Sequence, residues 1–151
     1  MLSSRSRYAL RAMLYLAKQK PDQLVLVADV AKKAKIPKKF LELILLDLKK
    51  RGLLHSQRGK NGGYTLARPA DQITFAEIIR ITDGPLAPIA CASVTAYRKC
   101  DDCEDEKTCA IRKVMRGVRD SMSAILDTVT LDDSLSGKAV LPVLKKGKVL
   151  L

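Results

Sequence analysis

Residues 27–68 read VADVAKKAKIPKKFLELILLDLKKRGLLHSQRGKNGGYTLAR, and their first half contains two runs with apolar residues at helical spacing. The first run, residues 27–34, is short and ends just before Ile36-Pro37. The second run presents one apolar face and ends at Gly52. Proline is favoured at the first position of a helix and glycine just beyond the last, so we expect the second helix to begin at Pro37.

The second half of the same stretch predicts a β-hairpin. Two short apolar segments, residues 53–56 and 64–66, flank the glycine-rich polar turn 58–63. A turn of this composition between apolar segments is typical of two antiparallel strands.

A further helix is predicted upstream, over residues 5–18. Its apolar residues follow the spacing i, i+3, i+4, i+7 of one amphipathic helix face: Ala9, Ala12, Met13 and Leu16. Three helices followed by a basic hairpin are the order of a winged helix-turn-helix, in which the hairpin is the wing. We therefore expect a mainly α fold whose residues 1–84 form a winged helix-turn-helix domain with a small β-hairpin wing.

The net charge of +12 is confined to this module. Residues 1–70 carry 16 Lys and Arg against 4 Asp and Glu, whereas residues 71–151 carry 12 of each and are neutral. A basic module joined to a neutral one favours a polyanion as partner, and the winged helix-turn-helix favours double-stranded DNA. Lysines that form only a solvated helix face, which is the alternative, would not require this segregation.

Candidate DNA contacts fall in three places. Lys38 and Lys39 lie at the start of the predicted recognition helix, where side chains reach base edges in the major groove. The wing offers polar groups for an adjacent minor groove and a glycine pair that permits close approach: Arg58, Lys60, Asn61, Gly62 and Gly63. Four residues before or within the first helix are candidates for holding phosphates: Ser3, Ser4, Arg5 and Arg7.

The neutral half predicts two further helices separated by a loop. Thr74 and Glu77 fit a capping box, and Gly84-Pro85 stops the helix that follows. From residue 109 to about 129, apolar residues recur every seven positions, as Ile111, Val118 and Ile125 and again as Met115, Met122 and Val129. Such a seam favours packing against another helix. We expect a cysteine-bearing sensor loop over 85–108, a long dimerisation helix over 109–131 and a loosely ordered tail over 132–151.

Four cysteines, Cys91, Cys100, Cys103 and Cys109, fall within one 19-residue stretch. No apolar run is long enough to span a membrane and no secretory signal pattern is present, so we expect a cytoplasmic protein. Clustered thiols there favour a metal or redox site over disulfide staples, and thiolates suit zinc or iron–sulfur clusters. Zinc fits less well, because only one CxxC pair is present and the stretch leads into a helix. Unligated thiols, or a Cys100–Cys103 redox switch, are the alternative.

The sequence offers little support for an enzyme. His55 is the only histidine and lies in the first predicted strand, far along the chain from the thiols. We interpret it as a surface or core residue and not as a ligand. No convincing nucleophile–base pair is present.

Four segments resemble one known family of bacterial transcription factors. They are residues 5–12 (RSRYALRA), 36–45 (IPKKFLELIL), 58–68 (RGKNGGYTLAR) and 73–84 (ITFAEIIRITDG). Over residues 1 to about 130 the chain resembles the Rrf-two family, the iron–sulfur cluster regulator type of winged-helix protein. The resemblance adds Tyr8 to Ser4 and Arg5 as expected DNA contacts of the first helix.

The resemblance implies properties that the residue patterns do not show. Members are homodimers whose long C-terminal helices cross, and they bind palindromic operators. Many hold a 2Fe–2S or 4Fe–4S cluster on three loop cysteines, while others hold none. Cys91, Cys103 and Cys109 correspond to those three. The sequence departs from the pattern in two ways. The gap from Cys91 to Cys103 is longer and contains Cys100, which is either a fourth ligand or a replacement for Cys103, so the cluster type stays open. Arg112 stands where one subgroup has a histidine ligand.

We therefore expect a homodimeric, sequence-specific DNA-binding regulator, a repressor, that senses iron, redox or nitric oxide state through an iron–sulfur cluster. A cluster-free regulator with a thiol/disulfide switch is the first alternative. A zinc-stabilised interaction protein is the second. No membrane partner is expected.

Overall fold

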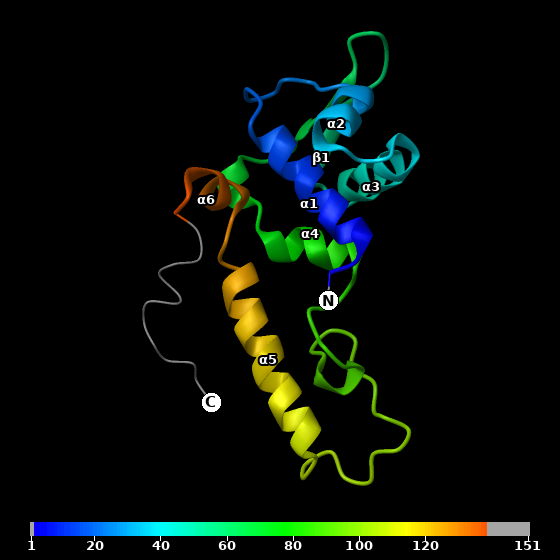
Figure 1. The fold of residues 1–151 in the computed structure, drawn as a ribbon, viewed down its shortest axis with the longest axis vertical. Coiled ribbons are helices and arrows are strands. Elements are labelled where there is room, and N and C mark those ends of the chain that lie inside the picture. Colours follow the sequence, from blue (N-terminus) through cyan, green and yellow to red (C-terminus); the bar gives the residue numbers. More distant parts are fainter. Residues whose placement is uncertain (1, 139–151) are drawn as a thin grey trace.

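The computed structural model describes residues 2–138 (Figure 1). Six α-helices, two 3-10 helices and two strands follow one another along these residues. In chain order they are α1 Ser4–Ala17, α2 Val27–Ala34, α3 Lys38–Lys50, β1 Leu54–Gln57, β2 Gly63–Leu66, η1 Ala70–Gln72, α4 Phe75–Thr82, η2 Ala90–Ala92, α5 Ala110–Leu126 and α6 Leu131–Ser136. The expected mainly helical winged helix-turn-helix with a C-terminal helix is confirmed.

Helix α1 lies at the centre of the domain, in contact with α2, α3 and α4. Its small residues Ala9 and Ala12 are fully buried, which lets the neighbouring helices approach closely. The largest fully buried side chains come mainly from α1, α3, β1, α4 and the segment just before α4, and include Met13, Leu41, Ile44, Leu45, Leu48, Leu54, Ile73 and Ile78. Burial of this apolar surface is the main force that holds the three helices and the hairpin together.

The helix starts follow the capping chemistry of the sequence with one correction. Thr74 accepts a hydrogen bond from the Glu77 amide while the Glu77 carboxylate accepts one from the Thr74 amide, so the predicted capping box is confirmed. The predicted start of the third helix at Pro37 is wrong by one residue. Pro37 has ψ 124°, which is not helical, and the helix begins at Lys38.

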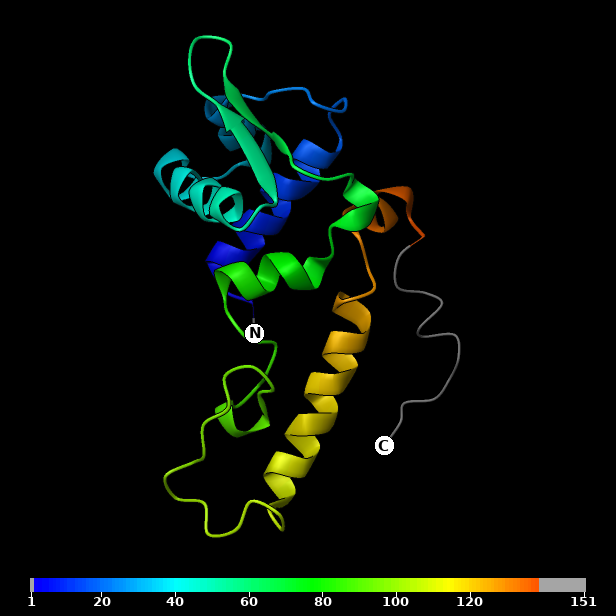
Figure 2. The same ribbon diagram turned by 180° about the vertical axis from the view of Figure 1, so that it is seen from behind.

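The hairpin pairs β1 with β2 in antiparallel register, with Leu54 opposite Leu66 and Gln57 opposite Gly63 (Figure 2). Val25, in the loop before α2, forms an isolated antiparallel β-bridge with Tyr64 through two 2.9 Å backbone hydrogen bonds. The wing is therefore joined to the loop before α2 by backbone hydrogen bonds at the start of β2.

Helix α5 extends away from the domain, and the chain then returns to it (Figures 1 and 2). Helix α6 contains residue 131, which we expected in the long helix, and residues 132–136, which we expected to be loosely ordered. Its Thr130–Asp133 capping box and the fully buried Leu131 explain the difference. Val129, expected in the long helix, lies after its end and is buried. The remainder of the expected loose tail, residues 139–151, lies outside the described residues.

Candidate nucleic-acid interface and cysteine-bearing loop

Helix α3 presents its N-terminal lysines to solvent because its apolar face points into the core. Lys38 and Lys39 are both exposed. The Lys38 ammonium lies 3.8 Å from the Glu42 carboxylate, and both side chains are more than half exposed. An exposed pair of this kind is weak, so Lys38 is available to a phosphate or a base edge.

A groove of about 430 Å³ separates α3 from the wing. Lys38, Glu42 and Lys49 of α3 line it, together with Arg58 of the wing and the start of α2. Lys60 and Asn61 are exposed in the wing turn and line a separate hollow beside α2. The groove therefore brings together Lys38 and Arg58 of the expected contacts, and its three cations suit a nucleic-acid backbone.

The glycine pair of the wing has a reason within the fold. A Cβ atom on Gly62 would lie 2.2 Å from the Gln57 carbonyl oxygen. Gly63 has φ +146°, and a Cβ there would lie 2.3 Å from the Val25 carbonyl oxygen. The close approach that we expected toward DNA is thus already required by the chain's own backbone, and a DNA contact of these glycines stays a prediction.

The candidate contacts of α1 are partly engaged within the protein. Ser3 caps the helix by accepting from the Ser6 amide and also hydrogen-bonds to the Asp83 carboxylate. The Arg5 guanidinium pairs with the Asp47 carboxylate of α3. Two further polar contacts lie nearby: Arg7 donates to the Ser4 hydroxyl at 3.0 Å, and Arg11 lies over the half-buried Tyr8 ring at 6.0 Å.

The cysteine-bearing loop lies at the opposite end of the molecule from the wing (Figures 1 and 2). Cys91 is buried in η2, whereas the other three cysteines are half-buried. The Cys91 side chain raises the pKa of Cys100. Partial desolvation, and then the Cys109 side chain, raise the pKa of Cys103. Cys100 therefore lies near Cys91, and Cys103 lies near both Cys109 and Cys100.

Two arginines of α5 hold this loop. Arg112 Nε donates to the Cys91 carbonyl at 3.0 Å, and its Nη1 donates to the Glu106 carbonyl at 3.3 Å. Arg119 Nη1 donates to the Ala92 carbonyl at 2.5 Å. The role of Arg119 was missed by the sequence reasoning, although its seven-residue spacing from Arg112 places both on one helix face.

The donor set of the loop has the right chemistry for a soft metal or an iron–sulfur cluster, because it supplies four thiols. Across residues 2–138, however, no three His, Cys, Asp or Glu side chains are arranged as a group that could hold a metal ion. Binding would therefore require the thiols to converge and to release their protons. His55 is exposed on β1, in the wing and not in the loop.

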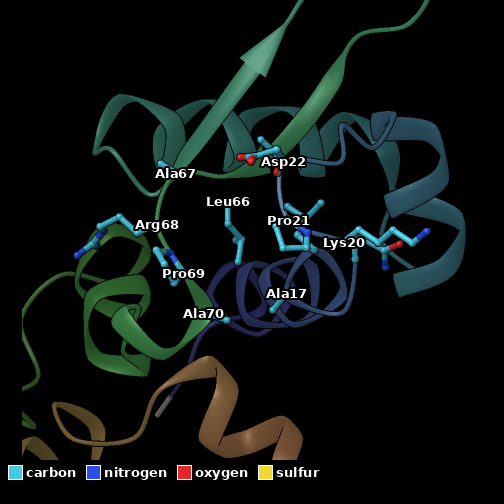
Figure 3. A pocket seen from close by; sticks show the side chains of 12 residues that line it. Ala17, Lys20, Pro21, Asp22, Leu66, Ala67, Arg68, Pro69 and Ala70 are labelled. Carbon is cyan, nitrogen blue, oxygen red and sulfur yellow. The ribbon is translucent and has the colours of Figure 1, made fainter.

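A separate cavity of about 370 Å³ lies between the end of α1 and the segment that follows β2 (Figure 3). Leu66 and Pro21 line its middle, while the side chains of Lys20 and Arg68 point away on either side. The buried polar residues among residues 2–138 are Ser6 and Ser93, and neither lines this cavity. The cavity therefore lacks the convergent polar groups of a ligand site.

Comparison with known proteins decides the family. The model of the Rrf2 family, described as iron-dependent transcriptional regulators, matches residues 2–136. The chain belongs to the Rrf2 family. It is a DNA-binding transcription regulator of that family, in agreement with the resemblance found in the sequence. Among residues 2–138, no helix is both long enough and apolar enough to cross a membrane.

Relatives of this Rrf2-family chain include named transcriptional regulators. It is 42% identical over 139 residues to the rrf2-like HTH-type transcriptional regulator of Rhodobacter capsulatus, which covers 90% of this chain and 93% of that protein. The solved structure of CymR, the global cysteine regulator of B. subtilis, has a TM-score of 0.73 and 31% identity, covering 90% and 96% of the two chains. The structure of T. potens IscR has a TM-score of 0.70 and 28% identity, covering 91% and 88%.

Proposed function

We propose that this Rrf2-family regulator is a homodimeric repressor that senses iron, redox or nitric oxide state through an iron–sulfur cluster. Cys91, Cys103 and Cys109 would hold the cluster, with Cys100 available as a fourth ligand. The observation that carries the proposal is the position of the four thiols. They lie in a loop whose main chain is hydrogen-bonded to α5 by Arg112 and Arg119.

The basic groove between α3 and the wing supports sequence-specific binding to DNA. We propose that Lys38 and Lys39 reach base edges while Arg58, Lys60 and Asn61 reach the adjacent minor groove, with Ser4, Arg5 and Tyr8 near the backbone. On DNA binding, the Arg5 guanidinium would exchange the exposed Asp47 carboxylate for a DNA phosphate, because both groups are anions that a guanidinium can bind. A palindromic operator follows from a dimer with twofold symmetry.

The exposed face of α5 supports the dimer. None of the helix's residues is buried in the single chain. Ile111 is 67% exposed, Val118 41% and Met122 38%, and these three belong to the seam that predicted a helix partner. Covering such a stripe with the same stripe of a second copy would remove apolar surface from water.

The proposed coupling passes through the two arginines. A change in the bonding of the thiols would move the main chain at Cys91 and Ala92, whose carbonyls accept from Arg112 and Arg119. These hydrogen bonds would transmit the change to α5. Since α5 joins the two protomers of the proposed dimer, its movement alters the separation of the two recognition helices and hence DNA affinity. The cluster itself, when bound, supplies the reactivity toward oxidants and nitric oxide.

A second candidate function is a thiol/disulfide switch without a cluster. The neighbouring thiols of Cys91 with Cys100 and of Cys103 with Cys109 favour it. Oxidation of one pair by hydrogen peroxide would join the two sulfurs, remove two electrons and two protons, and reduce the hydrogen peroxide to two molecules of water. The same arginine contacts would transmit this change.

Protein purified without oxygen separates the two candidates. Stoichiometric iron and sulfide with visible absorbance, lost in the Cys91→Ser, Cys103→Ser and Cys109→Ser variants, supports the cluster. Cys100→Ser lies in the same loop but outside the three corresponding positions, and it tests the fourth ligand: loss of iron in this variant as well would make Cys100 a ligand. A colourless protein after anaerobic reconstitution contradicts the cluster, and metal analysis then distinguishes zinc from a thiol switch.

A further inference from the structure

The recognition helix carries two large apolar side chains that the fold leaves in solvent. Leu43 is 64% exposed and Phe40 is 60% exposed, more than any other apolar residue of α3. They are three positions apart, so they are neighbours on the helix surface. The core-facing side of α3 is formed by other residues: Leu41, Ile44, Leu45 and Leu48.

The position of this apolar pair indicates what covers it. Single exposed apolar residues are ordinary, but Phe40 and Leu43 lie together in the first two turns of the helix expected in the major groove. Cations lie at both ends of the same helix: Lys38, Lys39, Lys49 and Lys50. This charge pattern favours a polyanion over an apolar protein surface as the occupant, and DNA offers one apolar group in its major groove.

We propose that Phe40 and Leu43 read the C5-methyl groups of thymines in each operator half-site. Thymine alone among the four bases carries a methyl group on its major-groove edge, and apolar side chains recognise it. Cytosine has a hydrogen at C5 and an amino donor at N4, so it offers less apolar contact. This inference rests on the proposed binding of α3 in the major groove, and it adds a preference for thymine at defined positions.

Deoxyuridine isolates the methyl group, because it pairs as thymidine does and lacks only that group. The probe is the duplex that the full-length wild-type protein enriches from a random DNA library. Each thymidine of this duplex is replaced singly by deoxyuridine, and the dissociation constant is measured at constant salt. We expect one or two positions in each half-site at which the replacement weakens wild-type binding about threefold to fivefold, the effect of burying one methyl group.

The variants Phe40→Ala and Leu43→Ala assign the methyl contacts to these residues. At the operator position that the replaced residue contacts, each variant should bind the thymidine and deoxyuridine duplexes equally well. At the position that the other residue contacts, the ratio of the two dissociation constants should stay as in the wild type. Leu46→Ala is the matched control, since Leu46 is also exposed on α3 but at 40% and on the side that lines the wing groove. It should retain the ratio at all positions. Circular dichroism and the melting temperature check that the variants are folded.

The outcomes separate this inference from the proposed function. An enriched duplex that no deoxyuridine replacement weakens overturns the methyl contacts and leaves DNA binding intact. A methyl-sensitive position that keeps its ratio in both Phe40→Ala and Leu43→Ala overturns the assignment to these residues. If the library yields no enriched sequence, sequence-specific binding itself is contradicted, and the inference falls with it.

Discussion

The guanidinium Nε of Arg112 donates a hydrogen bond to the main-chain carbonyl oxygen of Cys91, 3.0 Å away. The two residues are 21 positions apart in the sequence. The other three cysteines, Cys100, Cys103 and Cys109, all lie between them in the chain. The same guanidinium donates to the Glu106 carbonyl and lies 5.8 Å from the centre of the Tyr97 ring. One side chain in the first turn of α5 therefore ties both ends of the cysteine-bearing loop to the helix.

Replacing Arg112 with alanine should loosen this loop while leaving the winged helix-turn-helix intact. A hydrogen bond to a charged group contributes about 1.5–3 kcal/mol to stability, and less where water can replace the lost partner. Hydrogen exchange of amides in residues 90–109 should become faster in Arg112→Ala and stay unchanged in Arg116→Ala, a variant of an exposed arginine on the same helix. Equal protection of the loop in both variants would show that Arg112 does not hold it.

Replacing Leu131 with alanine should destabilise the whole domain. Leu131 is fully buried, and its amide donates to the Ile73 carbonyl at 3.0 Å, so α6 is part of the core. Truncation of a fully buried leucine costs about 2–5 kcal/mol of unfolding free energy. Urea denaturation measures this loss. Leu135→Ala, at a position of the same helix that is 36% exposed, should cost clearly less, and equal costs would argue against the burial of α6.

Acid should weaken the junction between α4 and α5 through Asp127. The hydrogen bond from Arg80, 2.9 Å between Nη2 and Oδ2, lowers the pKa of Asp127 below its ordinary value of 3.8. A carboxyl whose pKa is lower in the folded state stabilises the protein above pH 3.8, and this contribution is lost as the pH falls through the lowered folded pKa. Both side chains are about 40% exposed, so the effect is screened by solvent and salt.

The Asp127→Asn variant removes this contribution. Its unfolding free energy, measured in urea from pH 6 to pH 2.5, should fall less steeply below about pH 4 than that of the wild type, because one fewer proton is taken up on unfolding. The exposed Asp71→Asn variant should follow the wild-type curve. A wild-type slope in Asp127→Asn would mean that the pair with Arg80 does not persist in solution.

The wing can be tested by the salt dependence of DNA binding. If Arg58 and Lys60 each contact a phosphate, replacing either with alanine should lower the slope of log K against log salt by about one and weaken binding to all sequences. Lys107→Ala should keep the wild-type slope, because this residue belongs to the cysteine-bearing loop, which lies at the opposite end of the molecule from the wing (Figure 1). An unchanged slope in Arg58→Ala or Lys60→Ala would remove that residue from the interface.

The local patterns of the sequence predicted the winged helix-turn-helix because each of its elements is marked by short-range chemistry. The Thr74–Glu77 capping box and the hairpin turn depend on neighbours within a few residues, and both are present in the structure. Pro37 was misplaced by one residue because a proline fits both the last extended and the first helical position. Helix α6 was missed, because its single buried anchor, Leu131, packs against a segment almost sixty residues earlier.

The candidate site could be predicted only in part, because the sequence shows local patterns but not contacts between distant residues. The exposed lysines of α3 and the cations of the wing could be expected from charge and order along the chain. The partners of the functional groups could not: Arg5 with Asp47, and Arg112 with the Cys91 carbonyl, are contacts between residues far apart in the sequence. The expected roles of these residues toward DNA or a cluster remain predictions.

By itself the sequence determined the order of helices, the wing, the basic half and the clustered thiols, since periodicity, capping, turn chemistry and charge are properties of neighbouring residues. Only the tertiary structure decided that Gly62 and Gly63 are required by the backbones of Gln57 and Val25. It likewise decided that α6 closes the core and that Arg112 and Arg119 bind the loop to α5. These contacts join distant segments, whose approach depends on the burial of the whole core and not on any local pattern.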